Sequence, residues 1–447
     1  MNSIIKQIKM IPVLLLGLFL SNTVSAQQRL TLKEALNYAV QNSVKVRKAK
    51  LDIDGGKYKT EEIRAQALPQ ITGNAGLTYN PIIGKLVADL GDGTAKSIKL
   101  GQNWNSSAGI QLSQQLFNQT VFTGLQAARS SEEYYRLTSQ LTEEQIIELV
   151  ANNYYQVLVN RQQLNVLDTN IKNVKTVEKI IVTQYQNGLA KKIDVDRIKV
   201  NLANLQTQRD QTLNAITQLE NQLKFSMGMP VSTDINLPKT ELTEVTKLPQ
   251  FTDSISLDNR TEVKILDTQD KLYWLQRKAY VSEYYPSLAL TGNYTYSSQS
   301  GGFDFLKSNP SAIAFGASSV GLTLKVPIFN GFLTRSKIRQ ADVDIQKAKE
   351  DRRESTNALN MAYENAKIQL RNSLATINAQ KQNAELADEI YRSTQNNYNN
   401  GLANLTDLLD TENALTQAQN SYNQALLNYK IAEIQLIKSN GNIKSLL

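Results

Sequence analysis

Hydrophobic residues recur at every second position in four short segments of the chain. Each segment runs for about ten residues, the length that a tilted membrane-spanning strand needs. Small or polar residues fill most of the positions between, so the apolar side chains of each segment share one face of a strand. This alternation suits lipid on one side and water on the other, and it equally suits a small soluble sheet packed on helices. The apolar positions are Ile71, Ala75, Leu77 and Tyr79; Trp104, Ala108, Ile110 and Leu112; Leu288, Leu290, Tyr294 and Tyr296; and Val320, Leu322, Leu324, Val326 and Ile328.

A second spacing, of alternately three and four residues, predicts helices of unusual length. Neither Pro nor Gly interrupts the chain between Gly331 and Gly401, or between Gly124 and Gly188. As a helix, the first of these stretches would extend about 105 Å at 1.5 Å per residue. Asn, Gln, Ser and Thr crowd the remaining faces, which favours helices that line a water-filled lumen, although an ordinary solvated coiled coil has the same spacing. The spaced positions of the two returning helices are Val195, Ile198, Leu202, Leu205, Arg209, Thr212, Ile216, Leu219 and Leu223, and Leu408, Thr411, Leu415, Ala418, Tyr422, Ala425, Tyr429, Ala432 and Leu436.

An internal repeat relates the two halves of the chain. The sequence YQNGLA at residues 185–190 recurs as YNNGLA at residues 398–403, an offset of 213 residues, and the same offset pairs Asp194 with Asp407. Each copy is expected to hold a helix, two strands around a loop, and a long helical pair. The expected domains are therefore a first structural repeat, a linker rich in Pro, and a second structural repeat. Their boundaries are residues 27–229, 230–253 and 254–447.

The first 26 residues are expected to be a secretory signal peptide. Lys6 and Lys9 precede an apolar core of eleven residues, and Val24-Ser25-Ala26 offers the small residues of a cleavage site. The apolar core is too short to span a membrane as a helix, which needs about 20 residues. The mature chain is therefore expected to be exported.

The amino-acid composition argues against most kinds of catalytic site and against several classes of binding partner. The chain contains no His and no Cys, so it lacks the commonest general base, thiolate nucleophiles, disulfides and the softer metal ligands. No segment gathers carboxylates as a cleft would, and we expect no enzyme, no cofactor and no metal site. The net charge of +8, or +6 without Lys6 and Lys9, is modest for 447 residues and gives no reason to expect nucleic acid. The mean hydropathy of −0.36, without a long apolar run after the signal, excludes a helical membrane protein.

If the four segments do span a membrane, the chain must oligomerise. About eight strands are the fewest that close a barrel. An open sheet edge in hydrocarbon would leave backbone groups unpaired, at a cost of several kcal/mol each. Three copies would supply twelve strands.

Several short motifs resemble those of the outer-membrane efflux factor family typified by TolC. The segment LTLKEAL at residues 30–36, with Asn42 beyond it, resembles the opening helix of the family. NRTEV at residues 259–263 resembles the motif that opens its second copy, with Thr261 where Pro is usual. The most specific matches are the two turns YxxGLA, each followed by an Asp. With these motifs in this order, the resemblance covers essentially the whole mature chain.

This resemblance implies an architecture and a set of partners. The implied fold is an α+β membrane protein: a trimeric 12-stranded β-barrel, four strands per protomer, continued by a long α-helical coiled-coil tunnel. The implied function is the outer-membrane channel of a tripartite efflux or type I secretion system, a passive exit duct that reaches into the periplasm. Its implied partners are two further copies of the chain, a periplasmic adaptor, an inner-membrane pump and outer-membrane lipid.

The resemblance also assigns residues to a gate. Asp407 and Asp410, three apart and hence on one helix face, match an acidic constriction at the threefold axis. Asp194 and Tyr398 match a latch, although Ala403 stands where the family has a basic latch residue. The sequence alone explains each Asp equally as a residue favoured by the dipole at a helix N-terminus, and Asp194 as a cap. The implied adaptor-binding tips are Gly188, Leu189, Ala190, Gly401, Leu402 and Ala403.

Two alternatives remain open at this level. Within the family, the duct could export a polypeptide or a metal in place of small molecules, and the lack of His and Cys argues against soft metals. Outside the family, a periplasmic coiled-coil scaffold without channel activity would keep the helices and make the strands a small soluble domain.

Overall fold

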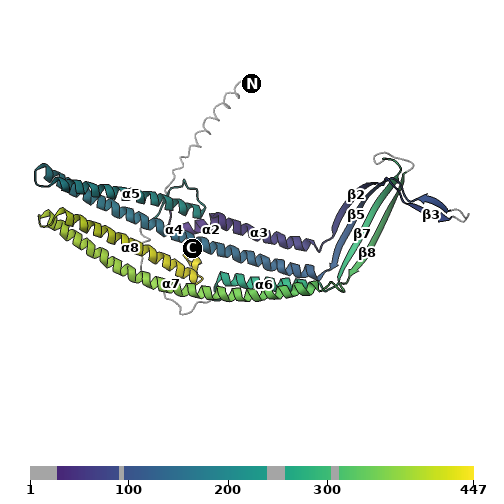
Figure 1. Cartoon of the computed structure of the whole chain (residues 1–447). Helices are drawn as coiled ribbons and strands as arrows, with labels where there is room; N and C mark the ends of the chain where they lie inside the picture. Colours follow the sequence, from purple (N-terminus) through teal and green to yellow (C-terminus); the bar gives the residue numbers. More distant parts are fainter. Residues whose placement is uncertain (1–27, 90–94, 239–256, 304–311) are drawn as a thin grey trace, which may run out of the picture. The chain divides into compact units, whose positions relative to one another are not determined.

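The structure, a computed structural model, describes residues 28–89, 95–238, 257–303 and 312–447 (Figure 1). The expected signal peptide and most of the expected linker lie outside these residues. The described chain forms two compact units, and each draws on both halves of the sequence. The first unit takes its residues from Met1–Val46, Glu143–Ser254 and Ala362–Leu447, and the second from Arg47–Thr142 and Ile255–Met361. These units follow three-dimensional packing, whereas the boundaries expected at residues 229 and 254 follow the sequence repeat.

The second unit contains an antiparallel sheet of four strands in the order β2-β5-β7-β8. All four predicted strands are present: β2 (Gln70–Tyr79), β5 (Trp104–Phe117), β7 (Ser287–Ser300) and β8 (Ile313–Lys325). The prediction was wrong at one end, because β8 stops at Lys325 and excludes Val326 and Ile328. Pro327 stands between these two residues and has no N–H group to continue a ladder.

The register of the sheet brings the apolar positions of all four strands to one face. Residues directly opposite in antiparallel strands share a face, and Ile71 lies opposite Leu112, Ile110 opposite Tyr294, and Leu290 opposite Leu322. On the other face Thr72, Gln111, Asn293 and Ser319 form one continuous polar row. The hydroxyl of Ser319 donates to the side-chain oxygen of Asn293 in that row. The sheet therefore has one apolar and one polar face.

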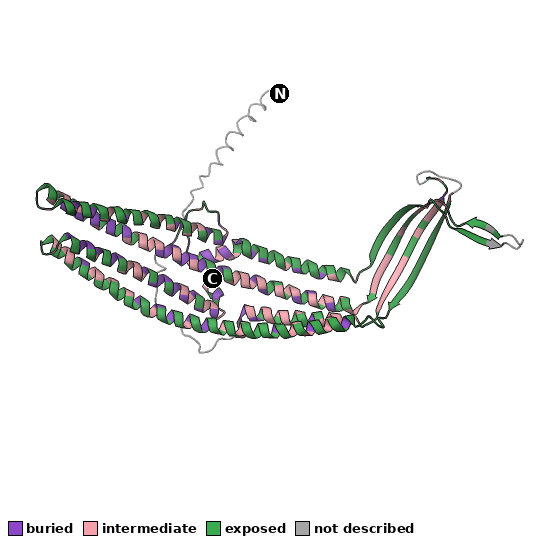
Figure 2. Cartoon of the chain, viewed as in Figure 1, coloured by how far each residue is buried: buried purple, intermediate pink, exposed green. Residues whose placement is uncertain are grey.

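Both faces of the outer strands are exposed in the single chain. Every residue of β2 and of β8 is exposed, and Figure 2 shows both strands green along their length. Each of these strands has one hydrogen-bonded neighbour among the described residues, so each leaves an edge of unpaired N–H and C=O groups. Such a sheet is incomplete as a monomer.

A hairpin absent from the sequence prediction lies in the loop between β2 and β5. Its strands are β3 (Lys85–Asp89) and β4 (Ala95–Lys99), and Lys85 lies opposite Lys99. Only a loop was expected between the two strands of each copy. Five-residue strands give an alternation too short to be recognised in the sequence.

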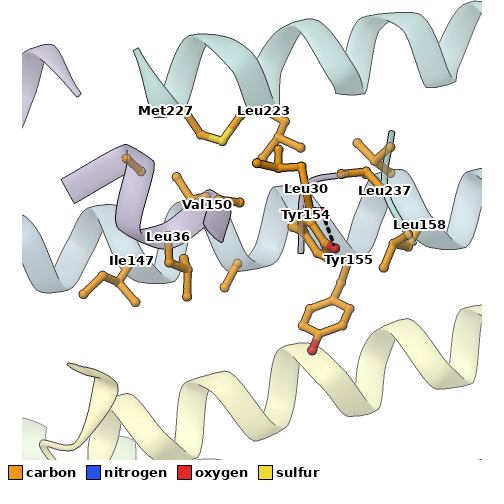
Figure 3. Packing of buried hydrophobic residues seen from close by; sticks show 14 of the residues in the cluster. Leu30, Leu36, Ile147, Val150, Tyr154, Tyr155, Leu158, Leu223, Met227 and Leu237 are labelled. Atoms are coloured by element: carbon orange, nitrogen blue, oxygen red, sulfur yellow. Dashed lines mark hydrogen bonds between the residues drawn. The ribbon is translucent and has the colours of Figure 1, made fainter. Parts of the chain in front are cut away.

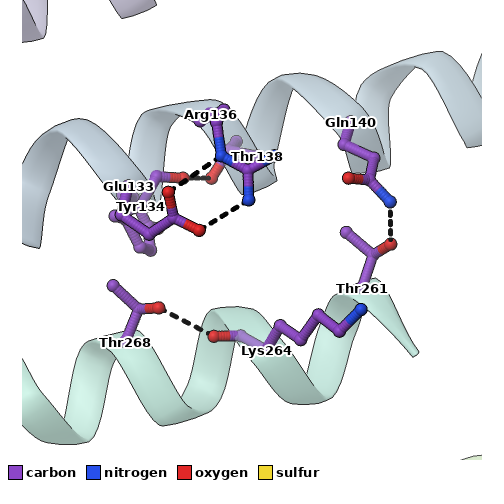
Figure 4. Close-up of polar contacts among 8 residues, drawn as sticks. All are labelled: Glu133, Tyr134, Arg136, Thr138, Gln140, Thr261, Lys264 and Thr268. Atoms are coloured by element: carbon purple, nitrogen blue, oxygen red, sulfur yellow. Dashed lines mark hydrogen bonds and ion pairs between the residues drawn. The ribbon is translucent and has the colours of Figure 1, made fainter. Parts of the chain in front are cut away.

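Four helices complete the second unit: most of α3 (Val44–Ala65), the first part of α4 (Gln119–Gln186), α6 (Thr261–Ser282), and the first part of α7 (Leu333–Asn399). Polar contacts join them. Gln140 of α4 donates to the Thr261 hydroxyl at 2.9 Å (Figure 4), and Arg277 of α6 donates to Asp342 of α7 at 2.6 Å. The contact between α3 and α4 is close enough that a Cβ at Gly56 would lie 2.7 Å from the Tyr135 ring.

The first unit is built around a buried apolar cluster (Figure 3). It joins the short helix α2 (Leu32–Asn42) to the second part of α4, the end of α5 (Lys192–Met227) and the end of α8 (Leu405–Ser439). Tyr154 is fully buried there, and its hydroxyl donates to the Leu30 carbonyl at 2.9 Å. The predicted opening helix begins with a capping box between Thr31 and Glu34, whose hydrogen bonds lower the pKa of Glu34.

Ion pairs tie the long helices of this unit together. Arg161 of α4 contacts Glu220 of α5 at 2.6 Å, and Lys438 of α8 contacts Glu148 of α4 at 2.7 Å. Short elements finish the unit: the parallel pair β1 (Gln28–Arg29) and β6 (Ile235–Asn236), and the 3-10 turn Ile443–Leu446. In the part of the chain that the structure describes, no helix is both long and apolar enough to cross a membrane.

Gly228, which ends α5, gives a test of this packing. Its φ is +75°, and a Cβ there would lie 2.4 Å from the Asn42 carbonyl oxygen, whereas Gly188 has φ +73° and open space around it. We expect Gly188→Ala to cost about 1 kcal/mol through backbone strain alone. Gly228→Ala should cost clearly more, since the end of α2 must also move. Thermal unfolding of the two purified variants checks this, and equal shifts would contradict the close approach.

Candidate functional site at the two helical turns

The two repeated sequences YxxGLA form two turns of the same geometry. One joins α4 to α5 and the other joins α7 to α8, and both lie at the left-hand end of the helices in Figure 1. Gly188 and Gly401 have φ of +73° and +76°, the left-handed conformation that ends a helix. The next N–H, of Leu189 or Leu402, donates to the carbonyl five residues back at 2.8 Å. Glycine adopts this left-handed conformation without the steric cost that a Cβ brings.

Each turn presents one leucine to solvent. Leu189 is 80 % exposed and Leu402 is 78 % exposed. The alanine after each leucine is only half-exposed, and Ala190 packs against the buried cluster below. The predicted tip residues therefore form two hydrogen-bonded backbone turns, each carrying one exposed apolar side chain.

A second apolar cluster holds the two turns together. It is formed by side chains of α4, α5, α7 and α8, with Tyr398 partly buried against it. Most of the cluster residues that come from the returning helices α5 and α8 are at positions of the predicted 3-4 spacing. The buried residues are Leu167, Ile171, Val174, Val177, Ile181, Val195, Ile198, Leu205, Tyr391, Leu405, Leu408, Leu409 and Leu415.

Asp407 and Asp410 lie at the start of α8 and both are exposed. The Asp407 carboxylate accepts from the Asn404 N–H at 3.2 Å, and the Asn404 side chain accepts from the Asp407 N–H at 2.9 Å. This capping box gives Asp407 a structural role at its own helix terminus. Its remaining surface, and that of Asp410 one turn later, still faces solvent. The geometry is therefore compatible with both explanations offered by the sequence.

Asp194 and Tyr398 are brought close together across the two turns. The pKa of Tyr398 is raised by burial of the phenol and by the negative charge of Asp194. Asp194 belongs to the first turn of α5 but is not its cap, because the capping position is Lys191 and has no side-chain bond. The capping explanation for Asp194 is thus wrong, while the latch role stays a prediction.

A link that the sequence reasoning missed joins the two turns more directly. Arg197 of α5 donates to the Thr406 hydroxyl of α8 at 2.7 Å. Ala403, where the family has a basic residue, is half-exposed and uncharged. Arg197 lies one helical turn after Asp194, and Thr406 lies directly before Asp407. Their closeness in the sequence to these two predicted residues was the only signal that could have identified them.

Comparisons with known proteins place this arrangement in a family. The family model described as "Outer membrane efflux protein" matches residues 35–229 and 275–442. Outer membrane protein TolC of Escherichia coli is 23% identical over 461 residues, which cover 97% of this chain and 87% of TolC. The alkaline protease secretion protein AprF of Pseudomonas aeruginosa is 24% identical over 425 residues, which cover 91% of this chain and 83% of AprF.

A solved structure shares the fold. The CmeC outer membrane channel of Campylobacter jejuni superposes with a TM-score of 0.72 at 15% sequence identity, over 92% of this chain and 85% of CmeC. Long helices and a four-stranded antiparallel sheet in each protomer are the common fold. The predicted fold class is therefore confirmed.

The Arg197–Thr406 bond predicts how firmly the turns are held. A typical intramolecular hydrogen bond contributes about 0.5–1.5 kcal/mol net, and this one is exposed to solvent, so Arg197→Ala should speed amide exchange around residues 402–408 by about two- to tenfold. Hydrogen–deuterium exchange of the purified protein measures this. Lys199→Ala, which removes an exposed cation of the same helix, is the matched control and should leave the exchange unchanged. Equal effects of both changes would rule out the link.

Proposed function

The chain belongs to the outer membrane efflux protein family, and on that premise we propose that three copies form a gated exit duct for an inner-membrane pump. Members of this family are non-enzymatic channels of the outer membrane with a helical extension into the periplasm. Family membership decides against the periplasmic scaffold without channel activity. The proposal concerns what is specific to this chain: its trimer, its gate, its adaptor and its pump.

The open-edged sheet is the observation that carries the proposal. One face of the sheet is apolar and aromatic, the other carries Thr, Asn, Gln and Ser, and the strands β2 and β8 each have a neighbour on one side only among the described residues. A membrane tolerates such a sheet only when its edges pair. Pairing β2 of one copy with β8 of the next, three times, gives twelve strands with lipid outside and water inside. This supports a homotrimer embedded in outer-membrane lipid.

The gate is proposed to lie at the two turns. A threefold axis multiplies each exposed carboxylate, so Asp407 and Asp410 would form two acidic rings that favour cations and close the resting duct. Within one copy a hydrogen bond from Arg197 to Thr406 links the two turns, and the charge of Asp194 acts on Tyr398. Bonds of this kind are worth about 1 kcal/mol each. A partner that binds the open form more tightly by a few kcal/mol would therefore open the gate.

The exposed leucines are proposed as the contact for a periplasmic adaptor. Leu189 and Leu402 stand out from rigid turns at the end of the helices, and neither is covered by its own chain. An apolar side chain on a preorganised turn loses little entropy when a partner buries it. The two matching turns would give an adaptor two equivalent apolar contact sites on each copy of the chain.

For the exported substrate we propose a class and not a specific molecule. The relative AprF is named for secretion of an alkaline protease, and CmeC is described as an outer membrane channel. A passive duct has no substrate site of its own in this proposal, because the pump selects. The proposed function is an exit duct for efflux or for type I secretion.

Single-channel recording of the mature protein in a planar bilayer tests the gate. We expect discrete cation-selective openings that multivalent cations block from the side of the helical turns. The double change Asp407→Ala with Asp410→Ala removes both acidic rings, so the blocking concentration should rise at least about tenfold.

Asp210→Ala, which removes an exposed carboxylate from the side of α5, is the control and should leave block unchanged. Unaltered block in the double variant would show that the constriction lies elsewhere. A protein that inserts as a trimer but never conducts would contradict the channel proposal itself.

A further inference from the structure

Glu412 is a buried carboxylic acid for which the gate described above has no use. It lies on α8, two residues after Asp410, and is 5 % exposed. Its Oε1 atom is covered and has no hydrogen-bond partner in the described part of the chain. Burying an ionised carboxylate without a partner is costly, so such a group favours its neutral form or a rearrangement that lets water in.

The surroundings of Glu412 supply no compensating charge. From α7 it is faced by Tyr391, also 5 % exposed, and the charged groups beside Tyr391 on that helix are Asp388 and Arg392, which are ion-paired with each other at 2.8 Å. From α4 the nearest polar contact lies one turn further along, where the Asn170 amide donates to the Thr416 hydroxyl at 2.5 Å. From α5 the cluster receives only apolar side chains, such as Val195 and Ile198. On α8 itself the closest charge is the exposed Asp410.

A neighbouring copy in a trimer cannot supply the missing partner while the helices stay packed. The covered Oε1 atom is already shielded by its own chain, so an added protomer would meet other atoms first. Movement of α8 relative to α7 and α4 would expose this Oε1 atom to water or a cation. The protonation state of Glu412 is therefore tied to the packing of these helices beside the turns.

We propose that Glu412 is a proton-operated switch, which keeps the helices at the turns packed while it is neutral and favours their opening when it ionises. This inference rests on the proposed function in one respect, since it identifies the parting of α7 and α8 with opening of the gate. The ligand of the switch is the proton itself. Low pH on the side of the turns holds the duct shut, and higher pH loosens it.

The direction and size of the effect follow from linkage. Burial raises the pKa of Glu412 from 4.5 to about 7 in the packed form. In an opened, hydrated form the carboxyl returns to its ordinary value, so the packed form binds the proton more tightly. The equilibrium between open and packed forms then rises between pH 4.5 and 7 and levels off above that. The full change is at most about 300-fold, the ratio that corresponds to a pKa difference of 2.5.

Two measurements on Glu412→Gln, which keeps the shape and cannot ionise, test the switch. The first is the difference in thermal unfolding midpoint between this variant and the wild type across pH 4.5–8. We expect almost no difference at pH 4.5 and a growing advantage of the variant as the pH rises. A purely structural role would give a difference that does not depend on pH. The chain has no His, so few other groups titrate in the upper part of this range, above about pH 6.

The second measurement is the open probability in a planar bilayer over the same pH range. The wild type should open more often as the pH rises, whereas Glu412→Gln should stay closed without a pH response. Glu433→Gln, on the same helix but ion-paired with Lys430, is the matched control and should behave as wild type.

The outcomes separate the two proposals. A midpoint difference that does not grow with pH overturns the switch, whether or not the protein conducts. A growing difference in a protein that never conducts supports the buried acid and overturns the channel. A conducting protein whose pH response is the same with Gln at this position overturns the coupling between Glu412 and the gate.

Discussion

The backbone hydrogen bonds missing from the outer strands β2 and β8 constrain everything else in this molecule. Inside a bilayer each unpaired N–H or C=O group costs several kcal/mol, so a four-stranded sheet with two open edges cannot remain alone there. In the proposed trimer, closure by identical copies would satisfy both edges at once, because the same contact between β2 and β8 would repeat around the axis. The same symmetry would turn any helical residue near the axis into a ring of three.

The helices of the first unit also have apolar surface that is uncovered in the single chain. Apolar residues on α7, including Ile368, Leu386 and Ile390, are exposed in the single chain although they lie on a long regular helix. Such exposure is expected of helices whose apolar surface would be buried by neighbouring copies, whereas a monomeric coiled coil would bury these residues within its own chain. At the turns the helices are held by the second apolar cluster and by the hydrogen bond from Arg197 to Thr406. In the proposed gate, a partner would have to act against these contacts.

The sequence predicted the strands and the turns because both have a simple periodic or stereochemical signature. Alternation placed Ile110 and Tyr294 on one face, and the register confirms it, while Gly188 and Gly401 take the left-handed conformation expected of them. Contacts between side chains distant in the sequence had no such signature. Arg197 and Thr406 look like ordinary surface residues until folding brings them together. Glu412 falls between apolar positions of α8, and its burial depends on the neighbouring helices rather than on its own spacing.

The most direct test of this account is a disulfide between the two open edges, which is simple to introduce into a chain without Cys. One cysteine replaces Asn74 in β2, and the second is moved along β8 through Ala317, Ser319 and Gly321. The account predicts that at least one pair cross-links separate chains in the membrane, in a ladder that ends at three. The pair Asn293→Cys with Ser319→Cys, directly opposite within one chain, should give only monomers. No ladder at any position, or a ladder that continues beyond three, would contradict closure of the sheet by a trimer.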